Sequence, residues 1–356
     1  MRSWLIYNCL FLILNASCGN SDSNVSESSG SPGGSNTSGD IPLPKPVPGA
    51  IPPPTPIPVG PVNRNDIVNV NNYYTSVYLP DQNVVPKWNG SFNPCVPGSV
   101  DSTSFNATLR RINYFRALAG TTSTITTDAT LNGYSQEAAL VFSANNFLGH
   151  SLSTSLKCYT TNANLGASKS VIHLKAGPQA IDDFIEDFGW GSVNAEVGHR
   201  RWLLYPLLTK VGIGMIPQTS QKASIAVYVV NQFNAKSPDV PLSWPPAGYV
   251  PSRNVFGRWS YSYPKADWTN AKIFLTYEGV ETEAPAISKK NGMGTNTIAW
   301  VVNNFGPNLI NTHEVHIKDI KVSTTNISVY YKTHIFSPST NTELTKLNQS
   351  ILQSPK

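Results

Sequence analysis

The sequence has little charge, little cysteine and no long apolar run, and each shortage argues against a class of protein. Only 13% of its 356 residues are charged, with 26 Lys and Arg against 21 Asp and Glu. The basic residues are scattered rather than gathered into a patch, so nucleic acid is not an expected partner. The longest apolar run, Trp4 to Leu14, is interrupted at Asn8 and is shorter than the roughly 20 residues of a membrane-spanning helix. No nucleophile elbow is present, which leaves Ser acyl transfer with little support.

The N-terminal segment has the pattern of an export signal. Arg2 precedes the apolar run, and the small residues before Cys18 predict a signal peptide over residues 1–17. The sequence Leu14-Asn15-Ala16-Ser17-Cys18 resembles a relaxed bacterial lipoprotein signal, which implies that Cys18 becomes the lipid-modified first residue and anchors the protein to a membrane. Ordinary cleavage followed by secretion is the alternative. If Cys18 carries a lipid, the expected location is the bacterial cell surface or outer membrane. Without the lipid, the protein is expected to be secreted.

A spacer follows the signal over residues 18–62. Residues 19–40 are almost entirely Ser, Gly, Asn and Asp, a composition that cannot bury enough apolar surface to offset the entropy of ordering. Residues 41–62 are rich in proline, which favours extended polyproline II. Together these segments predict a disordered tether between the membrane and the folded chain.

The chain contains four cysteines, of which Cys9 and Cys18 belong to the signal. Cys95 and Cys158 are then the only pair in the folded part. Because an exported protein meets oxidising conditions, they are expected to form a disulfide.

The residue pattern after the spacer predicts an α+β fold in two domains, over residues 63–235 and 236–340. A C-terminal tail is expected over residues 341–356. Apolar residues at helical spacing predict four helices in the first domain, and β-branched alternation then predicts two strands. The helices are expected over 101–120, 128–145, 178–188 and 195–204, and the strands over 210–216 and 224–231. The second domain contains short strands between Gly, Pro and Asn turns, which predict an all-β, immunoglobulin-like sandwich.

Four tryptophans of the second domain admit two interpretations. They could form a sugar-stacking surface or fill the core of the sandwich, and large aromatic side chains in a small sandwich favour the core. The four are Trp244, Trp259, Trp268 and Trp300.

Three ordered motifs carry a family resemblance. They are Arg111 to Ala119, then Ala138-Ala139 through Asn145 to Gly149-His-Ser151, and finally Val197-Gly-His-Arg-Arg-Trp-Leu-Leu-Tyr-Pro206. This order resembles the CAP superfamily of cysteine-rich secretory, antigen 5 and pathogenesis-related proteins. Gly-His-Arg in place of Gly-His-Tyr is similar to its bacterial branch. The resemblance implies an α-β-α sandwich (the SCP-like extracellular domain) with a surface cleft.

In that family two histidines and two acidic residues meet in the cleft. The resemblance places the histidines at His150 and His199, whereas one glutamate position is occupied by Ala163. Glu186 or Asp187 is the candidate for the second acid. Independently, Glu196 lies three residues before His199, so both are expected on one helix face.

Two histidines and one carboxylate could provide three ligands for a divalent ion such as Zn²⁺ and leave one position for water. Hydrogen bonding across the cleft by His150 and His199 is the alternative without metal.

Two functions therefore remain open. One is a binding or effector module for a small apolar ligand, a lipid or a partner protein, as the resemblance implies. The other is a metal-dependent hydrolase acting at His150 and His199. The sequence names no ligand and leaves open whether the protein is an enzyme.

Overall fold

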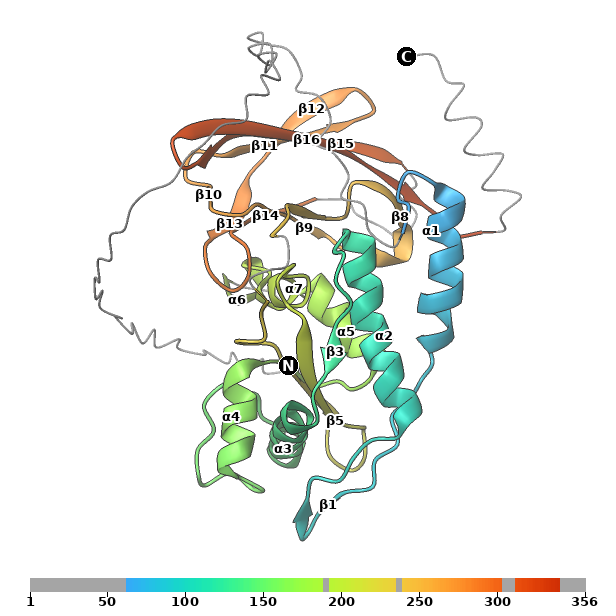
Figure 1. The fold of residues 1–356 in the computed structure, drawn as a ribbon, viewed down its shortest axis with the longest axis vertical. Coiled ribbons are helices and arrows are strands. Elements are labelled where there is room, and N and C mark those ends of the chain that lie inside the picture. The colour runs from blue at the N-terminus through green and yellow to red at the C-terminus, as the bar shows by residue number, and fades with distance from the viewer. Residues whose placement is uncertain (1–61, 188–191, 235–238, 303–310, 340–356) are drawn as a thin grey trace, which may run out of the picture. The chain divides into compact units, whose positions relative to one another are not determined.

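The computed structural model describes residues 62–187, 192–234, 239–302 and 311–339. The fold is α+β, with helices and a small sheet in the first part and a β-rich region in the second (Figure 1). None of the helices in these ranges is long and apolar enough to cross a membrane. The predicted signal peptide and C-terminal tail lie outside the described residues, as does the tether apart from Val62.

The α-helices lie in the first part of the chain. Their bounds are α1 Ile67–Tyr73, α2 Ser102–Ala119, α3 Ala129–Asn145, α4 Thr161–Lys169, α5 Pro178–Glu186, α6 Ser192–Ala195 and α7 Gly198–Leu203. The predicted helices at 101–120 and 128–145 are confirmed as α2 and α3. Residues 188–191 lie outside the described residues, so the third prediction is confirmed as far as Glu186.

Local capping explains why α2 and α3 begin and end where they do. The Asp101 carboxylate accepts the Ser104 N–H at 3.0 Å, and the Asp128 carboxylate accepts the Thr130 N–H at 3.0 Å. Both bonds satisfy helix N–H groups that lack a partner within the helix. At the other end of α2, Gly120 has φ 96°, a left-handed conformation that terminates a helix with little strain in glycine.

Helices cover both faces of the first sheet. Its strands are β3 Thr126–Thr127, β4 Ser170–His173, β5 Lys210–Ile216 and β6 Ser224–Tyr228, in the order β3-β5-β6-β4. A Cβ at Gly212 or Gly214 would overlap the backbone of α3, so these glycines allow α3 to lie directly on β5. Met215 points to the opposite face, where its sulfur lies 3.9 Å from the Thr108 hydroxyl of α2. The result is the α-β-α arrangement that the resemblance implied.

The β-rich region consists of two sheets. One has the order β12-β11-β15-β16-β8 with β10 beside β15, and the other the order β13-β14-β9-β7. The bounds are β7 Leu242–Trp244, β8 Gly248–Pro251, β9 Arg258–Ser262, β10 Ala266–Asp267, β11 Lys272–Tyr277, β12 Val280–Ala284, β13 Ala286–Lys290, β14 Thr297–Val301, β15 Thr312–Val322 and β16 Thr325–Phe336. The sheets pack face to face, because Trp259 of β9 contacts His313 of β15 and Tyr261 of β9 stacks on Tyr331 of β16.

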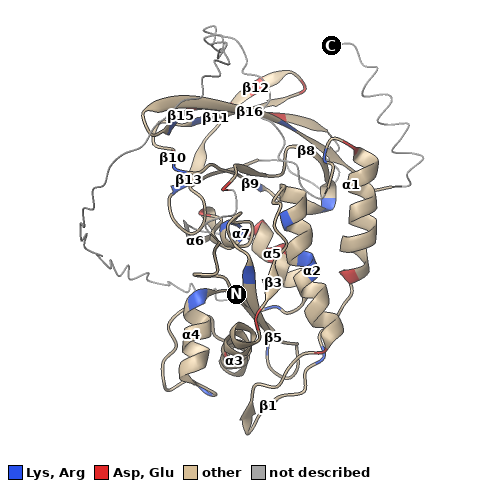
Figure 2. Ribbon diagram, in the orientation of Figure 1, with Lys and Arg blue, Asp and Glu red and all other residues tan. Residues whose placement is uncertain are grey.

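The four tryptophans of this region are core residues. Trp244, Trp259, Trp268 and Trp300 are all buried, so the sugar-stacking alternative is excluded for them. Charged residues are spread over many helices and strands, as Figure 2 shows, and no long stretch of ribbon carries a single sign.

The two parts share one hydrophobic core. Phe115 of α2 packs edge-on against Trp244 of β7 with ring centroids 5.4 Å apart, and the Tyr114 hydroxyl donates to the Asn254 side chain at 2.8 Å. The predicted boundary between residues 235 and 236 lies outside the described residues, and the division into two domains stays a prediction.

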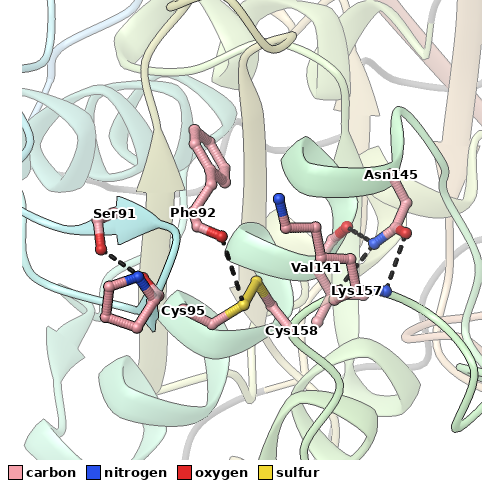
Figure 3. The surroundings of a disulfide bond; sticks show 8 residues. Ser91, Phe92, Cys95, Val141, Asn145, Lys157 and Cys158 are labelled. Carbon is pink, nitrogen blue, oxygen red and sulfur yellow. Dashed lines mark hydrogen bonds between the residues drawn. A yellow bond between two sulfur atoms is a disulfide. The ribbon is translucent and has the colours of Figure 1, made fainter.

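The predicted disulfide between Cys95 and Cys158 is confirmed (Figure 3). It links a short hairpin, β1 Ser91–Phe92 with β2 Cys95–Val96, to the loop between α3 and α4. The Asn145 side chain also braces that loop, since it donates to the Lys157 carbonyl at 2.9 Å and accepts the Lys157 N–H at 3.0 Å.

Candidate functional site

His199 and Asp187 form the central pair of the candidate site. The Asp187 carboxylate lies 2.9 Å from His199 Nδ1 and accepts the His199 backbone N–H at 3.1 Å. An ionised carboxylate only accepts hydrogen bonds, so the ring donates through Nδ1, and a neutral ring keeps its lone pair on Nε2. The Asp187 side chain is only 1% exposed, whereas the His199 side chain is 30% exposed. The buried Asp187 carboxylate therefore fixes the orientation of the partly exposed His199 ring.

The end of α5 explains why Asp187 reaches His199. Pro178 stands in the first turn, and Ile181, Phe184 and Ile185 form the buried stripe that holds the helix on the core. Asp187 is the C-cap with φ 56°, a left-handed turn that follows the last helical residue. From β9, Arg258 donates to the Asp187 carbonyl. Asp187 is thus held by backbone and side chain together.

A second histidine, His173, also contacts Phe184. The His173 ring is 5.9 Å from the Phe184 ring and the His199 ring 5.1 Å from it, measured between centroids. His173 Nε2 lies 2.9 Å from the Asp183 carboxylate, which also accepts from Lys175 at 2.8 Å. Burial opposes ionisation of Asp183, but hydrogen bonds from His173 and Lys175 outweigh it, and the pKa of Asp183 is lowered.

Sequence reasoning did not identify His173, because it belongs to no motif. A signal was nevertheless present. His173 is the last residue of strand β4 and Lys175 lies two residues further on, so a strand-like period of two would predict their side chains on one side. Both contact Asp183 in the structure.

His150 has a different environment from His199. It follows the end of α3, is exposed, and lies with Nδ1 2.9 Å from the Ala167 carbonyl of α4. A carbonyl only accepts, so the His150 ring also donates through Nδ1. The two family histidines therefore bond to different partners, His150 to the Ala167 carbonyl and His199 to the Asp187 carboxylate. The two rings do not form a hydrogen bond with each other.

Of the acidic candidates, Asp187 is the one that bonds to His199. Burial, and then the negative charge of Asp183, raises the pKa of Glu186. Glu196 instead pairs with Lys290 of β13 at 2.8 Å. The expectation that Glu196 and His199 share one helix face is wrong, because Val197 has φ 46° and interrupts the predicted 195–204 helix before α7.

Ala163 is buried in α4, and its N–H is capped by the Thr160 hydroxyl at 2.9 Å. Ala163 therefore provides no carboxylate to the site at the position where the CAP superfamily has a glutamate. Within the described residues there is no group of three or more His, Cys, Asp or Glu side chains placed to hold a metal ion. The donor set therefore does not fit a three-ligand metal centre, and the metal site at His150 and His199 stays a prediction.

Residues 109–233 match the family model described as the cysteine-rich secretory protein family, CAP. The match begins within α2 and ends after β6, so it includes both family histidines and Asp187. No curated protein matches the chain.

Replacing Asp187 with Asn is expected to lower the free energy of unfolding by about 1–3 kcal/mol, because an amide cannot accept all the N–H groups that the carboxylate accepts. Urea unfolding measures the loss. Asp183→Asn on the same helix is the matched control, since the Asp183 side chain is 23% exposed and its partners are partly exposed, and a loss below about 1 kcal/mol is expected. Equal losses in the two variants would contradict the role given to Asp187.

Proposed function

Since residues 109–233 form a CAP domain of the cysteine-rich secretory protein family, we propose that this chain is an exported binding module. A CAP domain in general indicates an extracellular binding or effector module. In our proposal a lipid on Cys18 holds the protein on a membrane, residues 18–62 act as the tether, and the CAP domain binds an apolar ligand such as a lipid acyl chain.

Two exposed apolar side chains beside His150 carry the proposal for the ligand. Phe147 is 39% exposed, and its ring lies against Gly149, the residue before His150. Leu165 is 37% exposed and stands on α4, whose Ala167 carbonyl holds the His150 ring. An apolar ligand that covers both side chains would remove their area from water, at about 25 cal/mol per Å².

The metal-dependent hydrolase is less well supported by the same residues. A catalytic zinc takes three protein ligands in a fixed geometry. Both Asp187 oxygens already accept hydrogen bonds from the His199 residue, and Ala163 supplies no ligand. The geometry therefore favours binding over hydrolysis at His150 and His199.

Flotation on density gradients tests the two parts of the proposal separately. Wild-type protein in cell membranes is expected to float with the lipid, and Cys18→Ala is expected to remain in the soluble fraction. Purified Cys18→Ala protein is then mixed with phosphatidylcholine vesicles. Adding Phe147→Ser and Leu165→Ser should weaken binding to the vesicles at least about tenfold, because burying each side chain contributes about 1.5–3 kcal/mol.

Val85→Ser in the Cys18→Ala background is the matched control. Val85 is 74% exposed and lies outside the CAP domain match, so its loss should leave vesicle binding unchanged. Unchanged binding by the Phe147 and Leu165 variant would overturn the ligand proposal. Turnover that requires Zn²⁺ and stops with chelator would favour the hydrolase instead.

A further inference from the structure

A small cavity lies between α7 and the strands β7 and β9. Its volume is about 20 Å³, and its walls include Arg200, Arg201, Trp244 and Ser260. A cavity of about 10–15 Å³ can hold one water molecule. The space therefore admits one small species and excludes polyatomic anions such as phosphate or sulfate.

Three nitrogen atoms of the lining residues donate to no acceptor among the described residues. Arg201 is only 4% exposed. Its Nη2 donates at 3.3 Å to the carbonyl of Lys290, the last residue of β13, and also to the Gly292 carbonyl in the loop that follows. Its Nε and Nη1 are buried without a partner, and so is the indole Nε1 of Trp244. An unsatisfied buried donor costs about 1–3 kcal/mol, and more when the group is charged, so an acceptor in the cavity is strongly favoured.

The charge of the walls selects the kind of acceptor. Arg200 is also buried, and its guanidinium donates to the Ile185 and Glu186 carbonyls and to the Ser260 hydroxyl, all neutral groups. Neither arginine forms an ion pair with a described carboxylate. Burial lowers the pKa of each to about 10, so both remain charged at neutral pH. Two buried positive charges on consecutive residues of α7 therefore border the cavity. Asp187, Glu186 and Glu196 act on them electrostatically, but none of these carboxylates forms an ion pair with either guanidinium among the described residues.

We propose that this cavity binds a monoatomic anion, chloride under ordinary conditions. Arg201 Nε, Arg201 Nη1 and Trp244 Nε1 donate to it, and the Ser260 hydroxyl, which accepts from Arg200, keeps a proton to donate. The anion offsets the positive charge of the buried guanidinium groups and accepts from the donors that have no acceptor among the described residues. Because α7 also carries His199, the bound ion stabilises the part of the CAP domain that presents this ring.

Thermal unfolding of the full chain tests the site, in sodium chloride and in sodium gluconate at equal ionic strength. Gluconate is too large for the cavity. Chloride should raise the wild-type melting temperature by about 2 °C or more and reach a plateau, as expected for a ligand that binds only the folded state. Trp244→Phe keeps an aromatic ring but removes one donor, and should need at least about tenfold more chloride for the same rise.

Trp268→Phe is the matched control. Trp268 is buried, and its Nε1, like that of Trp244, has no partner in the described part of the chain, but Trp268 does not line the cavity. This variant should lose stability and keep the wild-type chloride dependence. Crystals of the full chain grown in bromide should show an anomalous peak between Arg201 and Trp244. A cavity that holds water only, with identical melting in the two salts, would overturn the proposal, and so would equal chloride dependence in the two tryptophan variants.

Discussion

Replacing Arg116 with methionine should lower the free energy of unfolding by about 3–5 kcal/mol. Arg116 lies on α2 and is buried, and burial lowers the pKa of its guanidinium to about 9. Its Nη1 donates to the carbonyls of Leu203 and Tyr205, each at 2.8 Å, and its Nη2 donates to the Leu208 carbonyl at 3.0 Å. Methionine fills a similar volume but donates nothing, so three carbonyl groups in the interior lose the guanidinium as a donor. The Tyr205 carbonyl keeps the Leu208 N–H at 3.0 Å.

The same change should loosen the segment that follows α7. The three carbonyls belong to residues 203–208, which connect α7 to β5. Arg116→Lys should restore little of the stability, because one ammonium group cannot match a planar guanidinium that bonds in several directions. Urea unfolding followed by circular dichroism gives the free energies, and hydrogen exchange over residues 198–208 gives the local effect.

Lys318→Met provides the control for the loss of a positive charge. Lys318 lies on β15, and its ammonium is 3.9 Å from the Glu281 carboxylate at a partly exposed position. Removing such a pair should change the free energy of unfolding by about 1 kcal/mol or less. A loss in Arg116→Met as small as that of Lys318→Met would show that the three carbonyls find other partners.

The parts of the fold that the sequence predicted correctly depend on local signals. Asp101, Asp128 and Gly120 cap helices through contacts within a few residues, so a pattern of residue types is enough to find them. The disulfide was predicted because an exported protein meets oxidising conditions and the folded part contains a single pair of cysteines. Helix α4 was not predicted, because Thr161–Lys169 has only a short apolar face formed by alanine and glycine.

The candidate site was predictable in part. The family motif located His199 and narrowed its partner to Glu186 or Asp187, and the left-handed turn at Asp187 decides between them. The left-handed conformation of Val197 could not be predicted, because a β-branched residue disfavours positive φ and only tertiary contacts maintain it. For the same reason the helix that was expected to join Glu196 to His199 is broken. The buried arginines and their cavity depend on strands more than 40 residues further along the chain, which no local pattern reports.

Removing the disulfide should have an effect as large as that of Arg116→Met. Cys95 and Cys158 are separated by 63 residues, and closing a loop of this length stabilises the folded state by about 4 kcal/mol on the chain-entropy model. The loop contains α2 and α3, which form much of the helical layer on both faces of the first sheet. The unfolded chain without the bridge regains the freedom of this whole segment.

The hairpin that carries Cys95 retains other contacts without the bridge. The Pro97 carbonyl accepts from the Trp88 indole at 2.7 Å and from the Gln136 side chain at 3.0 Å. The Cys95→Ser and Cys158→Ser double variant is therefore expected to fold, with a free energy of unfolding about 4 kcal/mol lower than that of the wild type. Urea unfolding of the oxidised wild type, the reduced wild type and the double variant measures the effect. The reduced wild type should match the double variant, and reductant should not change the double variant further. If reduction left the unfolding curve of the wild type in place, the bridge would contribute nothing to stability, and the hairpin contacts at Pro97 would alone hold this segment.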